Sequence, residues 1–534
     1  MLEMAKRVAI IGSGASGLAA IKCCLDEGLQ PVCFEKGTDI GGLWNFKEEA
    51  LPGFASVYRS TVTNTSKEMM CYSDFPIPKE YPNFMHHSWV IKYFRLYADN
   101  FGLIKHIRFR HHIDHVKLRE DFTETGQWDV TYTNEKNEST TEVYDAVMVC
   151  TGHHVYPHYP RDTFPGIDDF QGKIIHSHDY KDHLGFENKR VVIIGIGNSA
   201  GDIAVELSHH AKQVYISTRS GTWVLNRISP SGVPADIVAF RRVLQNCVPS
   251  SVKEAVARRQ LNQRFDHALY GLQPEHNVLG QHPMINDDLP SRIATGSLVI
   301  KPNIKRFTKT GVVFDNDMVE YDIDIVVFAT GYRFDFPFID ESVMKVENNQ
   351  VTLYKYVFPP KLDPPTLSII GLVQPLGAIM PISEMQCRWA TRVFKGTARL
   401  PSQGAMFDDI RKKKMEMPKR YHSTIKHTFQ VNYIEFMDEI AEQIGVKPDL
   451  KRLLLSDPRL ALTVFAGPCT PYQYRLMGPG AWKGAKEAIE TQWDLIAYPT
   501  KTRPVPEKTT NGVPGILKLL LVVALIVAII WKLL

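Results

Sequence analysis

The sequence lacks any pair of cysteines spaced for redox or metal chemistry. Its eight cysteines form no Cys-x-x-Cys pair and no zinc-binding spacing, standing at positions 23, 24, 33, 71, 150, 247, 387 and 469. A disulfide framework and a structural zinc site are therefore not expected, and scattered thiols are typical of a protein that faces the reducing cytosol. No metal ligand is predicted.

The chain also has no strong excess of one charge. Its 62 Lys and Arg residues against 58 Asp and Glu residues leave a net charge of +4 over 534 residues. This balance gives no support to nucleic-acid binding, so the basic run Arg411 to Lys414 is predicted to be a solvated helix face. A chain of this length exceeds one compact core and is expected to form two or three domains.

A secretory signal is missing at the N-terminus, where the short apolar stretch Val8 to Ile11 predicts a buried strand instead. A long hydrophobic run occurs only at the other end, where residues 516–534 are apolar apart from Lys518 and Lys532. As a helix this run spans about 28 Å, against a hydrocarbon core of roughly 30 Å. We expect a membrane anchor after a linker at 501–515, and leave open whether it spans the bilayer or only dips into it.

Two glycine-rich nucleotide fingerprints are present. The first follows Val8 to Ile11 and consists of Gly12, Ser13, Gly14, Ala15, Ser16 and Gly17. The second follows Val191 to Ile194 and consists of Gly195, Ile196, Gly197, Asn198, Ser199 and Ala200. A strand, a tight glycine turn and a helix N-terminus together bind a pyrophosphate, and the third position needs only a small residue. Each copy therefore predicts a dinucleotide site.

The two copies differ in the residue expected to contact the ribose. Glu35 closes the predicted strand Pro31 to Phe34 of the first copy, and a carboxylate suits a free 2′-hydroxyl. Arg219 takes the corresponding place in the second copy, and a guanidinium suits a 2′-phosphate. The first site is therefore predicted to bind FAD or NAD and the second NADPH, which indicates electron transfer between two cofactors.

Apolar strands that close on Thr-Gly occur twice, at 146–152 and at 325–331. This repetition is typical of flavoproteins in which one nucleotide domain is inserted into another. We predict an α/β fold of two nested Rossmann-like dinucleotide-binding domains. The predicted segments are the first part of the FAD domain at 1–164, the NADPH domain at 165–330, and a second FAD part with helices at 331–500. Within the NADPH domain, a helical and partly basic insert at about 222–290 is predicted to serve as a lid or membrane-facing subdomain.

A longer motif lies between the two fingerprints. Its pattern F-x-G-x-x-x-H-x-x-x-Y-K runs from Phe170 to Lys181 and resembles the identifying sequence of the flavin-containing monooxygenases. The related Baeyer–Villiger monooxygenases share its first half but usually end in Trp followed by Pro or Asp. The resemblance covers essentially the whole chain, which looks like the vertebrate membrane-bound members. It extends to residues 41–44, 64–70, 329–332 and 371–377 and to the apolar tail.

This resemblance implies a reaction. NADPH reduces FAD, O2 adds to the reduced flavin to give a C4a-hydroperoxide, and a soft nucleophile such as an amine or a sulfide takes the distal oxygen. The protein supplies orientation, hydrogen bonds and exclusion of water. The implied partners are small-molecule substrates, O2, membrane lipid through the C-terminal helix and a second copy in a homo-oligomer. The implied location is the endoplasmic reticulum membrane, with the catalytic domains facing the cytosol.

The resemblance also implies site residues. Asn64 is expected over the flavin as a catalytic hydrogen-bond donor, although Thr63 to Ser66 also suits an ordinary turn. His176 is expected to hold linker geometry rather than to act in catalysis. Expected FAD contacts are Gly12, Ser13, Gly14, Ala15, Ser16, Gly17, Glu35, Gly42, Leu43, Trp44, Asn64, Thr65 and Gln374. Expected NADP contacts are Thr63, Asn64, Gly195, Gly197, Asn198, Ser199, Ala200, Gly201, Asp202 and Arg219.

His282 bears on the substrate class. It precedes Pro283 where other vertebrate members mostly carry an acid, and the pattern with histidine looks like the member associated with ketone oxygenation. A histidine could tune the proton balance of the oxidant, because its ordinary pKa lies near 6.5. A surface residue in a loop is the alternative.

Two other functions use the same nucleotide sites. A pyridine nucleotide–disulfide reductase has the same nested domains but needs a redox-active cysteine pair, and the adjacent Cys23 and Cys24 do not fit that pattern. A membrane-tethered nucleotide sensor would bind FAD without turning over. NADPH-dependent consumption of O2 separates this sensor from an enzyme.

Overall fold

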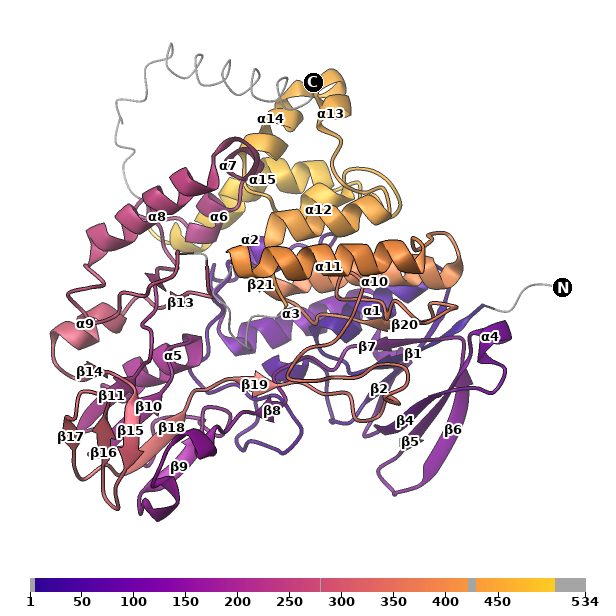
Figure 1. The fold of residues 1–534 in the computed structure, drawn as a ribbon. Helices are drawn as coiled ribbons and strands as arrows, with labels where there is room; N and C mark the ends of the chain where they lie inside the picture. The colour runs from indigo at the N-terminus through magenta and orange to yellow at the C-terminus, as the bar shows by residue number, and fades with distance from the viewer. Residues whose placement is uncertain (1–4, 279, 421–428, 505–534) are drawn as a thin grey trace, which may run out of the picture.

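Two parallel sheets, each flanked by helices, form the lower half of the computed structural model (Figure 1). The structure describes residues 5–278, 280–420 and 429–504. The first sheet has the order β20-β7-β1-β2-β3, and all its neighbours are parallel. Its strands are β1 (Arg7–Ile11), β2 (Gln30–Glu35), β3 (Ile107–Phe109), β7 (Ala146–Val149) and β20 (Leu367–Ile369).

The central strand β1 is buried on both faces, which explains its unbroken apolar sequence. Val8 and Ile10 pack into a core shared with the helices α1 (Ala15–Asp26), α3 (His87–Asn100) and α10 (Ile379–Lys395). Ala9 and Ile11 face the opposite core. An antiparallel sheet covers that side, made of β4 (His112–Leu118), β5 (Trp128–Thr133) and β6 (Ser139–Tyr144).

The second sheet repeats this plan in the order β14-β11-β10-β18-β9, again parallel throughout. Val191 and Ile193 of the central strand pack toward α5 (Asn198–Leu207), and Val192 and Ile194 pack toward a small antiparallel sheet. The strands are β9 (Lys173–His176), β10 (Arg190–Ile194), β11 (Gln213–Ser217), β14 (Leu298–Lys301) and β18 (Ile325–Phe328), with β15 (Ile304–Phe307), β16 (Val312–Phe314) and β17 (Val319–Glu320) on the covering side. The prediction of an α/β fold with two Rossmann-type sheets is confirmed, whereas the domain boundaries stay predictions.

The chain crosses between the two sheets at an antiparallel pair, β8 (Tyr156–Pro157) and β19 (Tyr332–Arg333). His176 fixes this crossing. Its Nδ1 accepts a hydrogen bond from the His178 amide (3.0 Å), so the proton sits on Nε2, which donates to the Gly331 carbonyl (3.0 Å). Burial lowers the pKa of His176 to about 4, which keeps the ring neutral. Both ring nitrogens are therefore hydrogen-bonded to backbone groups.

The expected helical insert contains α6 (Ala235–Ala239), α7 (Arg242–Cys247) and α8 (Ser250–Arg264). It also contains something the sequence pattern did not indicate, a parallel pair of two-residue strands, β12 (Val224–Leu225) and β13 (Met284–Ile285). Helix α7 lies against the C-terminal helix α14 (Pro458–Ala466) (Figure 1). Arg241, between α6 and α7, stacks over the Trp493 ring of α15 (Ala485–Ala497). The buried Arg242 joins these parts through hydrogen bonds to Gln473 (2.8 Å) and Asp438 (2.6 Å).

Of the other described helices, α9 (Leu289–Ala294) packs beside α5 and β14 of the second sheet, α4 (Phe122–Thr125) precedes β5, and the rest lie above the first sheet (Figure 1). The helices above the first sheet are α2 (Lys67–Met70), α11 (Gln403–Arg420), α12 (Tyr433–Gln443) and α13 (Leu450–Ser456). Among the described helices, none has the length and apolar character that crossing a membrane requires. The predicted anchor at 516–534 and residues 505–515 of the predicted linker lie outside the described residues.

A buried ion cluster ties the nucleotide helix α1 to the C-terminal region. The guanidinium of Arg475 lies 2.7 Å from the Glu384 carboxylate of α10 and 2.9 Å from Asp74. Lys22 of α1 pairs with the same Asp74. These side chains lie in the core, with 2% of the Arg475 side chain and 1% of the Glu384 side chain exposed. Removing one of these charges would therefore leave a buried partner without its counter-charge, which destabilises the fold.

Candidate active site at the two nucleotide turns

The first glycine turn has the geometry that a pyrophosphate site requires. Gly12 has a φ of +98°, and a side chain on Gly17 would place Cβ 1.9 Å from the Gly12 carbonyl oxygen. These two glycines therefore close the turn against α1. At the N-terminus of α1, Gly14 offers no side-chain cap and the first turn holds no acid, so its backbone N–H groups remain free for an anion.

Glu35 lies beside this turn, at the end of β2. Its Oε2 accepts hydrogen bonds from the amide and the hydroxyl of Ser13 (2.9 Å each), and its Oε1 accepts from the Gly37 amide (2.7 Å). These contacts hold the carboxylate next to the turn, and Oε1, which accepts only one of them, keeps a further lone pair that suits a ribose hydroxyl. The predicted contact with the ribose stays a prediction.

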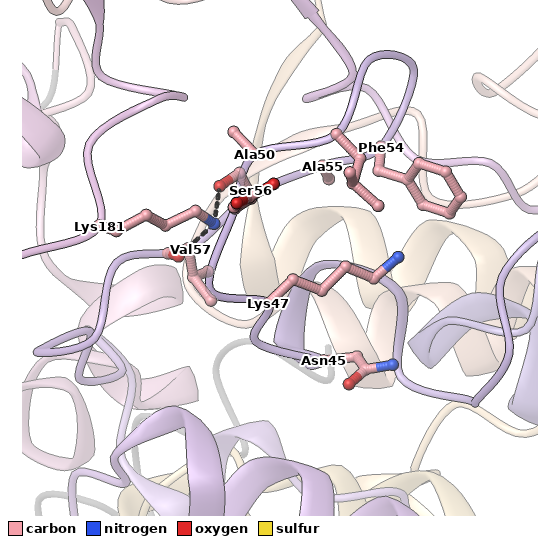
Figure 2. Close-up of a pocket in the computed structure, with 10 residues that line it drawn as sticks. Asn45, Lys47, Ala50, Phe54, Ala55, Ser56, Val57 and Lys181 are labelled. Carbon is pink, nitrogen blue, oxygen red and sulfur yellow. Dashed lines mark hydrogen bonds between the residues drawn. The ribbon is translucent and has the colours of Figure 1, made fainter.

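The predicted FAD contacts Gly42, Leu43 and Trp44 lie beside the first glycine turn. A Cβ on Gly42 would lie 3.1 Å from the Gly14 Cα, so the short helix Gly42–Trp44 faces the turn. A pocket borders the Glu35 side, because a Cβ on Gly37 would lie 3.5 Å from the Phe54 ring that lines it. Figure 2 shows Lys47 and Lys181 approaching this pocket from different segments.

Lys181 ends the long motif noted in the sequence, and its place in the pocket gives that lysine a structural role. Its Nζ donates to the Ser56 hydroxyl (2.6 Å) and to the Val57 carbonyl (3.3 Å) (Figure 2). The lysine thereby attaches the segment between β9 and β10 of the second sheet to the loop that follows the first nucleotide turn.

The second turn repeats this geometry with one difference. Gly195 has a φ of +119°, and a Cβ there would lie 2.4 Å from the Ala329 carbonyl oxygen, whereas a Cβ on Gly197 would meet no described atom within 4 Å. The buried Ala200 shows why the third position tolerates a methyl group. Arg219 lies exposed just after β11, at the end expected to hold the 2′-phosphate.

The N-terminal half of α5 also carries two polar side chains predicted to contact NADP. The Oδ1 of Asn198 accepts from the Ile285 amide (2.8 Å), which leaves its NH2 group available. The two carboxylate oxygens of Asp202 accept from the Tyr58 hydroxyl (2.6 Å) and from the Asn286 amide group (3.0 Å). Asp202 therefore joins the two nucleotide halves, a role that the sequence pattern did not indicate.

Asn64 lies in the loop that links these halves. Its Oδ1 accepts a hydrogen bond from Nη2 of Arg227 (2.7 Å), and the Thr63 carbonyl accepts from Nε of the same guanidinium (3.2 Å). Farther along, the Ser66 amide donates to Asp236 of α6 (2.7 Å). Burial raises the pKa of Asp236 to about 6. Sequence reasoning missed Arg227 and Asp236 because their contacts depend on how the insert folds back, and it missed Tyr58 because its partner Asp202 is 144 positions away in the chain.

Gln374 and Thr65 complete the predicted FAD contacts. Gln374 begins β21 (Gln374–Leu376) and is in register with Gln430 of β22 (Gln430–Asn432). Gln430 is buried, and neither atom of its amide group has a partner within the described part of the chain. Thr65 is half-buried beside Asn64. Contact of Gln374 and Thr65 with the cofactor stays a prediction.

His282 is half-buried, which disfavours the alternative of a freely exposed loop residue. Its Nδ1 lies 3.2 Å from the Pro283 carbonyl oxygen, and burial lowers its pKa below the ordinary value. It lies close enough to His154 to contribute to the lowering of the pKa of that histidine to about 4, although burial is the larger cause. Both imidazoles are therefore neutral at pH 7.

The cysteines argue against the disulfide reductase alternative. All eight are free thiols, and seven of them are buried. Burial raises the pKa of the Cys23 and Cys24 thiols, so neither forms the thiolate that disulfide exchange needs. No cysteine pair is available to accept electrons from a flavin.

Comparison with known proteins agrees with this geometry. Residues 5–534 match the family model described as flavin-binding monooxygenase-like. The chain is 55% identical over 510 residues to flavin-containing monooxygenase 5 of Rattus norvegicus, covering 95% of each protein. It is 50% identical over 528 residues to dimethylaniline monooxygenase [N-oxide-forming] 2 of Cavia porcellus, covering 98% of each.

Solved structures have the same fold. S-allyl-L-cysteine S-oxygenase from Allium sativum superposes with a TM-score of 0.64 at 24% identity, over 92% of this chain and 99% of that one. Cyclohexanone monooxygenase from Rhodococcus sp. Phi1, bound to NADP+, gives a TM-score of 0.58 at 15% identity over 83% and 98%. The chain therefore belongs to the flavin-containing monooxygenases, NADPH-dependent oxidoreductases whose cofactors are FAD and NADPH.

Proposed function

We propose that this protein uses NADPH and O2 to oxygenate soft nucleophiles, such as the nitrogen of a tertiary amine or the sulfur of a thioether. One observation carries the proposal. The loop with Asn64 is hydrogen-bonded to α5 through Tyr58 and to the insert through Arg227, so it bridges the two nucleotide turns. Relatives at 50% identity are named dimethylaniline monooxygenases, N-oxide-forming, which supports an amine as substrate.

The residues of this chain supply binding and orientation for that chemistry. FAD, when bound, takes hydride from NADPH and activates O2. The free N–H groups at the N-termini of α1 and α5 suit the two pyrophosphates. Asn64 offers an amide N–H at the junction of the two nucleotide turns, because Arg227 occupies its Oδ1.

The test is oxygen transfer under isotopically labelled O2. The purified yellow protein is supplied with NADPH and either a thioether or dimethylaniline, and the products are analysed by mass spectrometry. We expect a sulfoxide or an N-oxide that carries the label. Oxidation of NADPH without a labelled product would contradict the proposal, and no oxidation of NADPH at all would favour the nucleotide sensor.

Oxygenation of ketones to esters, with substantial release of H2O2 from NADPH oxidation, is a second candidate. The half-buried, neutral His282 favours it, because this reaction needs a nucleophilic, deprotonated oxidant and a neutral imidazole can accept a proton. Relatives at 53–55% identity are named flavin-containing monooxygenase 5.

The substitution His282→Glu tests this candidate. We expect ester formation from an aliphatic ketone to fall by roughly 100-fold, the lower range for loss of a general base, while sulfoxidation is unchanged. His112→Glu, at an exposed position on β4, is the matched control. Equal losses of ester and sulfoxide in His282→Glu would show that the histidine does not distinguish the two reactions.

We propose further that residues 516–534 anchor the protein to the endoplasmic reticulum membrane with the catalytic domains in the cytosol. The length and apolar character of this segment support the proposal. Recovery of a chain truncated after residue 504 in the soluble fraction of cell extracts, and of the full chain in the membrane fraction, is the expected result. The full chain in the soluble fraction would contradict it.

A further inference from the structure

The carboxamide of Asn64 can act as a donor or an acceptor, depending on which way it is turned. Its Oδ1 can only accept hydrogen bonds, and its NH2 group can only donate them. Arg227 donates to Oδ1 at 2.7 Å and has no acceptor atom to offer in exchange. The orientation of the amide is therefore set, and its NH2 group has no acceptor among the described residues.

Arg227 is itself held firmly, which makes it suitable for this task. Its backbone amide donates to one oxygen of Asp287 (3.1 Å), and Nη1 lies 3.3 Å from the other. Nε donates to the Thr63 carbonyl, so a single guanidinium is hydrogen-bonded both to the backbone of the loop and to the Asn64 side chain. Only 15% of the Arg227 side chain is exposed. A planar guanidinium that is bonded to Asp287, Thr63 and Asn64 at once has little freedom to rotate away from Asn64.

The short strands of the insert explain how Arg227 and Asp287 meet. Leu225 of β12 and Ile285 of β13 are partners in a parallel register, and Arg227 and Asp287 each follow two residues later. The pair therefore forms where the two strands end. The pairing of β12 with β13 thus places Arg227 beside Asp287, from where its guanidinium reaches the loop of the first nucleotide domain.

We propose that Arg227 is a positioning residue that makes Asn64 a hydrogen-bond donor toward the bound nucleotides. This inference rests on the proposed function and deepens it. The positive guanidinium polarises the amide and strengthens donation by its NH2 group, as in other charge-assisted networks. Loss of Arg227 lets the amide turn and present its oxygen instead, so NADPH oxidation continues but oxygen is released as H2O2.

A double-mutant cycle tests the inference. We expect Arg227→Met and Asn64→Ala each to lower the sulfoxide formed per NADPH consumed by about tenfold, the worth of one hydrogen bond to a charged group. The double variant should show no further loss, because both changes remove one donor. Arg227→Lys keeps a donor but not the fork, and should recover part of the loss. Arg259→Met, exposed on α8 of the same insert, is the control.

A second readout does not depend on turnover. Adding NADP+ to the oxidised holoenzyme perturbs the absorption spectrum of the flavin, and we expect Arg227→Met and Asn64→Ala to alter that perturbation in the same way. Additive losses in the double variant, or a wild-type product ratio in Arg227→Met, would overturn the inference. If Arg227→Met fails to retain FAD, Arg227→Lys takes its place in the cycle. If the wild type forms no oxygenated product, the proposed function fails and the spectra alone decide.

Discussion

Alanine at Gly197 should strongly weaken NADPH binding while leaving the fold and the FAD content intact. The backbone at this position is not left-handed, and an added Cβ would meet no described atom within 4 Å, so the protein itself accommodates the methyl group. The methyl group would occupy the space through which the pyrophosphate approaches the N-terminus of α5. Loss of two charged hydrogen bonds predicts binding weaker by roughly 100-fold or more, measured by titration with NADP+.

Two further variants make this result specific. Gly14→Ala alters the other turn, where the Cβ would lie at an ordinary 3.6 Å from the Gly42 Cα, and should lose FAD instead. Gly404→Ala is the matched control, because a Cβ at this position on α11 also meets nothing within 4 Å, far from either turn in the chain. Unchanged NADP+ affinity in Gly197→Ala would mean that the pyrophosphate does not sit at this turn.

Replacement of Arg475 by methionine should destabilise the protein by about 3–5 kcal/mol, the cost of breaking a buried ion pair from one side. Glu384 and Asp74 would remain buried without their shared cation, and Ser73 would lose the bond from Nε (2.7 Å). We expect a lower midpoint of thermal unfolding, measured by calorimetry at matched FAD content.

A second substitution, at Glu384, shows how much of the loss of stability comes from the unpaired carboxylate and how much from the changed volume of the side chain at position 475. Arg475→Met with Glu384→Gln should be more stable than Arg475→Met alone, because the amide is cheaper to bury than an unpaired carboxylate. Arg411→Met removes an exposed pair with Asp408 and should change stability by less than about 1 kcal/mol. Equal stability of Arg475→Met and the wild type would show that water or another group compensates the buried acids.

The sequence predicted the two nucleotide turns well, because their requirements are local. A glycine with positive φ, a small third residue and an uncapped helix all lie within six residues of Gly12 or Gly195. Buried parallel strands such as β1 and β10 are equally local, since each is a run of apolar residues that two cores share.

The contacts around Asn64 could not be predicted in this way. Arg227 is 163 positions from Asn64 in the chain, and it reaches the loop only because two-residue strands pair in the insert. Strands that short carry no periodic pattern. Asp202 shows the same limit, because its place in the fingerprint indicates a nucleotide contact, whereas its hydrogen bonds lead to Tyr58 and Asn286.

The strand order of the first sheet also has a consequence for synthesis of the chain. β20 pairs with β7, yet it begins 218 positions after β7 ends, and the whole second sheet lies between them. A ribosome therefore releases every strand of the second sheet before the edge of the first sheet can be completed. Because domains fold as units during translation, the second sheet can close on its own, while the first must wait with β7 unpaired on one side.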